Sequence, residues 1–112
     1  MTNQEIALKI AKLLDERKAS SIVVLDVANK SSFADYLIIA TGNSDRQLRG
    51  LISEIDEKLA ADGVFARATE GDASSGWVLM DYGDSIVNIF SPDMRTRYNL
   101  DKVWGDCPTV EW

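Results

Sequence analysis

The sequence predicts a single α/β domain whose mixed sheet of about five strands carries helices on its faces. Three observations predict this fold class. Apolar residues recur at helical spacing in two segments, β-branched apolar runs alternate with those segments, and turn residues separate them. The length of 112 residues suits one domain, expected to span residues 1–112, with a core that needs no disulfide or metal.

The first predicted elements are a helix from residue 4 to about residue 17 and a strand at 22–27. The helix follows a Thr-Asn-Gln-Glu capping box that starts at Thr2, and its apolar residues recur three and four positions apart. The strand is β-branched and almost wholly apolar, which is typical of a strand covered on both faces.

A β-α-β unit is predicted next, from strand 36–41, helix 44–62 and strand 64–70. The helix begins at a capping box formed by Ser44 and Gln47, and it ends at Gly63, which suits a left-handed cap. We expect the unit to be right-handed and parallel.

The last predicted elements are an antiparallel hairpin and a short helix. The strands 77–81 and 85–90 are joined by so few residues that they are expected to pair with each other. Ser91 followed by Pro92 predicts the start of a helix that carries residues 94–98.

The composition excludes several kinds of active site. The chain has no His, which excludes Ser-His and Cys-His catalytic pairs and zinc sites that use His. Its one cysteine, Cys107, cannot form an intramolecular disulfide, and Asp106 beside it disfavours a reactive thiolate. Since the N-terminus also lacks a signal-peptide pattern, we expect a cytoplasmic protein.

The charge favours a basic partner over a nucleic acid. With 12 Lys and Arg against 18 Asp and Glu, the formal net charge is -6, which opposes affinity for phosphate backbones. From residue 68 to residue 94 there is no Lys or Arg, and the acidic residues in that span are Glu70, Asp72, Asp81, Asp84 and Asp93.

Two motifs permit both a functional and a structural interpretation. The turn 41–44 precedes a helix and lies near Arg46 and Arg49, so it is either an anion site or a capped turn; it lacks the glycine pattern of a phosphate loop. A second set could serve metal or acid-base chemistry, or turns and a protein-binding surface, although its spacing counts against a metal. This set comprises Asp26, Asp35, Asp81 and Asp84. No cofactor or metal is expected.

Four strings in this order resemble the ribosomal silencing factor family, also called RsfS or Iojap. They are VVLDV at 23–27, SSFADYLIIATGNSDRQ at 31–47, EGDASSGWVLMDYGDSIVNIFSP at 70–92 and RTRYNLDKVWGD at 95–106. The resemblance runs from about residue 4 to residue 110 and implies a nucleotidyltransferase-like core without the catalytic motif.

The resemblance implies a non-enzymatic cytosolic factor that binds the large ribosomal subunit at its basic L-fourteen protein. Such a factor blocks joining with the small subunit, represses translation when nutrients are scarce, takes part in late maturation of the large subunit, and is often a homodimer when free. It touches little or no nucleic acid and no membrane. The alternative, a nucleotide-binding or nucleotidyltransferase-type enzyme, rests on the predicted β-α-β unit and the Asp cluster.

The resemblance also carries over candidate partner-binding residues. These are Trp77, Asp81, Tyr82, Gly83, Asp84, Arg95, Tyr98, Trp104 and Asp106. The carboxylates are expected to meet basic side chains, the aromatic residues to supply anchors or support, and Gly83 to permit the turn. From composition alone, the aromatic residues are equally suited to the core and to an interface. A further set is interpreted mainly as structural: Asp35, Tyr36, Ser44, Arg46 and Gln47. The family usually has His at the position of Asn88.

Overall fold

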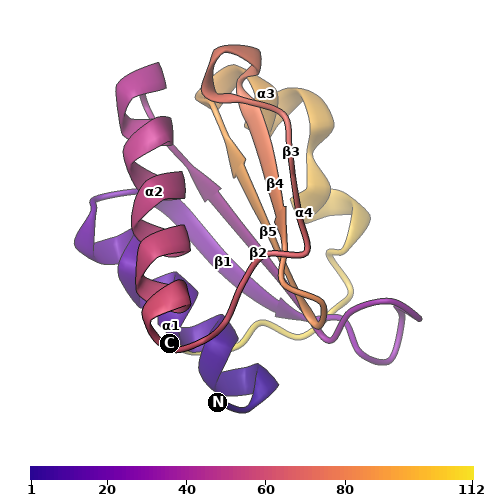
Figure 1. The fold of residues 1–112 in the computed structure, drawn as a ribbon. Coiled ribbons are helices and arrows are strands. Elements are labelled where there is room, and N and C mark those ends of the chain that lie inside the picture. The colour runs from indigo at the N-terminus through magenta and orange to yellow at the C-terminus, as the bar shows by residue number, and fades with distance from the viewer.

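The computed structural model describes residues 1–112 and confirms the predicted fold class, a mixed five-stranded sheet with helices on both faces (Figure 1). In chain order the elements are α1 (Asn3–Glu16), β1 (Ser20–Asp26), β2 (Tyr36–Thr41), α2 (Asp45–Ala61), β3 (Ala68–Glu70), the 3₁₀ helix η1 (Ala73–Ser75), β4 (Trp77–Asp81), β5 (Ser85–Phe90), α3 (Pro92–Tyr98) and α4 (Leu100–Val103). None of the helices has the length and apolar character needed to cross a membrane.

The strand order is β1-β2-β5-β4-β3, with β2 and β5 parallel and the other neighbours antiparallel. The predicted hairpin of β4 and β5 is confirmed. The predicted β-α-β unit is wrong in its pairing, because β3 runs in the same direction as β2 but lies at the far edge of the sheet. All six residues of β5 are buried and all three of β3 are exposed, so β5 is the strand suited to the centre.

Both long helices lie on one face of the sheet, to its left in Figure 1, rather than covering its two faces. The other face is covered by α3, by the unpredicted α4 and by the segment after α4 that carries Trp104 and Cys107. We call these the α1–α2 face and the α3–α4 face. The short helices are needed because β2 and β5 are apolar on both sides: Ile38 packs toward the α1–α2 face and Ile39 toward the α3–α4 face.

The helix ends follow the sequence closely. Thr2 and Glu5 form the predicted capping box, with the Glu5 N–H donating to Thr2 Oγ1 at 3.1 Å. At the start of α2, the Gln47 N–H donates to Ser44 Oγ at 3.0 Å, but Gln47 Oε1 accepts from Asn43 N–H instead of closing the box on Ser44. Gly63 is left-handed, with φ of 77°, directly after the helix cap.

The outer edge of β1 is covered by the C-terminal tail. The Asp26 N–H donates to the Pro108 carbonyl at 2.9 Å, and the Val110 N–H donates to the Val24 carbonyl at 2.8 Å. The prediction that strand 22–27 is covered on both faces holds for Val24 and Leu25, which are buried, but Ile22 and Val23 are half-buried at this edge. The opposite edge strand, β3, pairs only with β4.

Candidate functional site

The α3–α4 face carries most of the candidate residues, because β4 alternates between the two faces. Val78 and Met80 pack toward the α1–α2 face, while Trp77 and Leu79 pack toward the α3–α4 face. Asp81 lies opposite Ile86, which also faces α3 and α4. Trp77 and Asp81 therefore share one face and lie about 13 Å apart along the strand.

Trp77 is an aromatic anchor held in one orientation. Its ring centroid lies 4.6 Å from that of Tyr98 and 5.1 Å from that of Phe90. Its indole Nε1–H donates to Oδ1 of Asn88 at 2.9 Å. Asn88 is 2% exposed, so its amide acts as a buried support for the half-buried indole.

A cleft of about 390 Å³ opens beside this anchor, between the edge of the sheet and α3. We call it the Trp77 cleft; it is lined by Glu70, Gly71, Ser75, Trp77, Leu79, Met94 and Tyr98. Gly71 has φ of +82°, and a Cβ there would lie 2.2 Å from the Trp77 carbonyl oxygen, so this wall of the cleft requires glycine. The alternation of β4 could have indicated Leu79, whereas Met94 joins the cleft only through the packing of α3.

Arg95 links α3 to α4 and to the end of β2. Its Nε and Nη2 donate to the two carboxylate oxygens of Asp101 at 2.8 Å each, and its Nη1 donates to Thr41 Oγ1 at 3.0 Å. These hydrogen bonds hold the pKa of Asp101 below its usual value. Because its side chain is 13% exposed and each of its three nitrogens donates a hydrogen bond, Arg95 fixes α3, and with it Tyr98, against the sheet.

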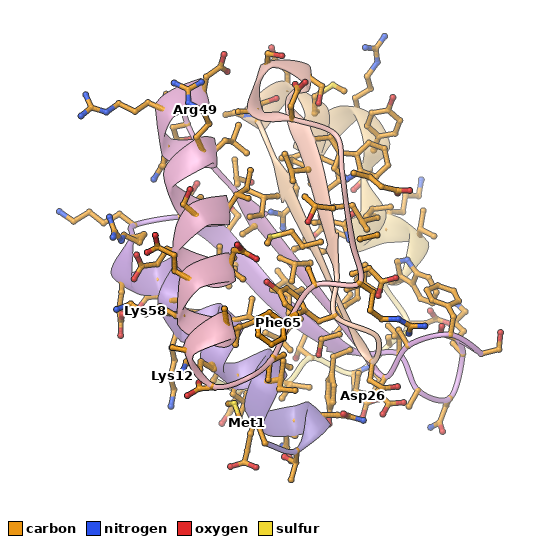
Figure 2. All side chains as sticks on the ribbon, viewed as in Figure 1. Met1, Lys12, Asp26, Arg49, Lys58 and Phe65 are labelled. Atoms are coloured by element: carbon orange, nitrogen blue, oxygen red, sulfur yellow. The ribbon has the colours of Figure 1, made fainter.

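The other end of the sheet gathers the four Asp residues of the predicted acidic set, and Figure 2 labels one of them, Asp26. Asp81 Oδ1 accepts from the Gly83 N–H at 2.7 Å, and Gly83 has φ of +87°. Asp84 is exposed, and its carbonyl accepts from the N–H of Asp35 at 2.9 Å. No three carboxylates here form a group that could hold a metal ion.

Arg67 and Tyr82 lie on either side of this hairpin turn. The Arg67 side chain passes over Gly83, so a positively charged side chain lies beside the acidic turn. Tyr82 points to the opposite face and is 9% exposed. Burial and the nearby Asp56 raise the pKa of Tyr82 to about 12, and its hydroxyl has no hydrogen-bond partner. Tyr82 is therefore a core residue that fixes the hairpin against the α1–α2 face.

Trp104 and Asp106 hold the C-terminal segment on the α3–α4 face. Trp104 is half-buried against the apolar cluster that includes Leu25 and Leu37. Asp106 pairs with Lys30 at 2.6 Å, and the hydrogen bond from Lys30 lowers the pKa of Asp106. These contacts tie the tail to the loop between β1 and β2.

The turn before α2 fits the capped-turn interpretation better than an anion site. The Gly42 N–H donates to the Phe90 carbonyl, the Asn43 N–H to Gln47 Oε1, and the Gln47 N–H to Ser44 Oγ. Three backbone donors of this turn are therefore engaged within the protein, and this agrees with a capped strand-to-helix turn.

Comparison with known proteins identifies relatives along the whole chain. A family model described as "Ribosomal silencing factor during starvation" matches residues 1–112. The chain is 40% identical over 110 residues to ribosomal silencing factor RsfS of Bacillus subtilis, covering 97% of this chain and 93% of that protein. It is 38% identical over 111 residues to its counterpart in Halalkalibacterium halodurans, covering 99% and 95%. A crystal structure of a protein from Chromobacterium violaceum matches with a TM-score of 0.89 and 35% identity, over 94% of this chain and 88% of that one.

Proposed function

Because the chain belongs to the ribosomal silencing factor family, we propose that it binds the large ribosomal subunit at its basic L-fourteen protein and sterically blocks joining with the small subunit. Membership of this family makes it a non-enzymatic regulator of translation that associates with the ribosome. The observation that supports the finer mechanism is the α3–α4 face, where an anchored tryptophan and an acidic hairpin lie on one surface. Such a surface suits a basic protein better than RNA.

We assign contact and support roles within the nine candidate residues. Contact falls to Trp77 and Tyr98 as aromatic anchors and to Asp81 and Asp84 as acidic groups. The others support that surface: Tyr82, Gly83, Arg95, Trp104 and Asp106. Tyr82 and Arg95 are assigned to support because they present little side chain to solvent. Asp106 is exposed and is assigned to support because it pairs with Lys30, and Trp104 because it packs under the C-terminal segment.

The wider proposal describes the setting in which this contact acts. The protein works in the cytoplasm, represses translation when nutrients are scarce, and takes part in late maturation of the large subunit. It is a homodimer when free and needs no cofactor. Little direct contact with nucleic acid is expected, because the formal net charge of -6 opposes binding to phosphates.

The mechanism is tested by sedimentation with purified subunits. The protein should co-sediment with large subunits, lose that binding when the subunits lack L-fourteen, and slow the joining of large to small subunits. Failure to co-sediment with complete large subunits would contradict the proposal. So would equal binding to subunits that lack L-fourteen.

Charge reversal at the hairpin tests the acidic contact. Asp84→Lys changes an exposed side chain and should weaken large-subunit binding about tenfold, or about 1.4 kcal/mol. At Asp81 the variant is Asp81→Asn, because the side-chain oxygen that caps Gly83 must be kept. Glu57→Lys, on the exposed side of α2, is the matched control and should leave binding unchanged. Unchanged binding by the Asp81→Asn/Asp84→Lys double variant, with normal circular dichroism, would refute the acidic contact.

A further inference from the structure

We infer that the partner binds by strand addition: an extended segment of the basic protein pairs with the open edge of β3 and places one apolar side chain in the Trp77 cleft. This inference rests on the proposed function and specifies how the partner is recognised. The segment it predicts carries a large apolar residue next to a Lys or Arg. Main-chain hydrogen bonds supply affinity in this mode, and the pocket beside the edge supplies specificity.

The first observation is the state of the two sheet edges. Residues of the C-terminal tail cover the outer edge of β1 with two backbone hydrogen bonds, from the N–H groups of Asp26 and Val110. The outer edge of β3 has no such cover, and all three of its residues are exposed. Its sequence, Ala-Thr-Glu, contains neither the Pro nor the Lys with which proteins commonly protect an edge.

The second observation is that the cleft adjoins this edge on one face. Glu70 is the last residue of β3 and also lines the Trp77 cleft, because it lies opposite Leu79 and shares its face. Side chains of an added strand alternate between faces and sit beside their cross-strand neighbours. A residue paired next to Glu70 would therefore place its side chain beside Glu70, on the face that carries Trp77 and Leu79 and at the rim of the cleft.

The third observation is the charge of the lining. Glu70 is the one charged residue among the seven that line the cleft, and four of the others are apolar. The span that forms its walls up to residue 94 has no Lys or Arg. A carboxylate at the rim of an apolar cleft favours an incoming cation beside an apolar side chain, which is the pattern offered by a basic protein segment.

Internal contacts hold the floor and walls of the cleft without a partner. The hydrogen bond from Trp77 to Asn88 fixes the floor, and the tight turn at Gly71 fixes one wall. Ser75 and Asp72 form a capping box that holds η1 in place next to that wall. A site ordered in advance loses less conformational entropy when a segment docks.

Amide hydrogen–deuterium exchange of the unaltered protein, free and bound to purified large subunits, is the direct test. Strand addition should slow exchange of amides within residues 68–70 at least tenfold in the complex. Glu70→Lys should weaken binding about tenfold, whereas Glu16→Lys, an equal change of charge at the end of α1, should leave it unchanged.

The outcomes separate this inference from the proposed function. Binding to large subunits with no protection at residues 68–70 would overturn strand addition and leave the proposed function standing. Protection of those amides already in the free protein, together with a dimeric mass, would assign the edge to a second copy and also overturn it. Equal effects of Glu70→Lys and Glu16→Lys would refute the predicted cation. Absence of large-subunit binding would count against the proposed function itself.

Discussion

The hydrogen bond between Trp77 and Asn88 makes a testable contribution to stability. Asn88→Ala removes the acceptor that lies 2.9 Å from the indole nitrogen, at a position that is 2% exposed. Leaving the donor of the half-buried indole without a partner costs about 1–3 kcal/mol, and the space vacated by the amide adds to that cost. We expect a loss of about 2–3 kcal/mol in the free energy of unfolding, or about 8–12 °C in the melting temperature.

A double-mutant cycle isolates the hydrogen bond from the cavity. Trp77→Phe removes the donor, so Asn88→Ala in that background should cost only the cavity term. The coupling energy should be about 1–2 kcal/mol. Urea denaturation followed by circular dichroism measures all four proteins without relying on tryptophan fluorescence. Additivity of the two substitutions to within about 0.5 kcal/mol would refute the claim that Asn88 holds the indole.

Three further predictions concern pH and backbone geometry. Asn88→His keeps an acceptor for the indole only while the ring is neutral, so the buried His should have a lowered pKa. The stability of this variant should fall as the pH drops below about 6.5, whereas that of wild type should stay flat there, and a pH series of urea denaturations measures both. Arg95 lowers the pKa of Asp101, so the stability that their ion pair contributes is complete above the usual carboxyl pKa and is lost as the pH falls below it. Below about pH 4, wild type should therefore lose stability more steeply than Asp101→Asn. Parallel curves of stability against pH would contradict the ion pair. Gly71→Ala should destabilise more than twice as much as Gly83→Ala, since both positions have positive φ but only the first brings a Cβ against backbone, and equal melting temperatures would contradict that geometry.

The helices could be predicted because their signals are local. The capping residues Thr2, Ser44 and Ser91 each lie within three residues of the backbone group that they cap. The parallel pairing of β2 with β5 joins Tyr36 to Ser85, and no local pattern marks that choice over β3. For the same reason the sequence did not reveal that α1 and α2 share one face.

The site was predictable in part. The resemblance indicated Trp77 and Tyr98, but it did not distinguish them from Tyr82, whose burial follows from the alternation of side chains around the hairpin turn. The support from Asn88 could have been found, because a tight turn fixes the register that places Leu79 opposite Asn88 and brings Trp77 diagonally near it. The Trp77 cleft could not, since it depends on how α3 returns over the sheet.

The cover that residues 108–110 place on β1 limits how this protein can assemble with itself. A sheet with two open edges can add copies at both sides and grow into a fibre, whereas a sheet with one open edge is complete after a single isologous pairing. Removing the tail after Cys107 would give each copy a second adhesive edge. With the tail in place, no more than two copies can pair through their sheet edges. A chain that lacks the tail should form species larger than a dimer.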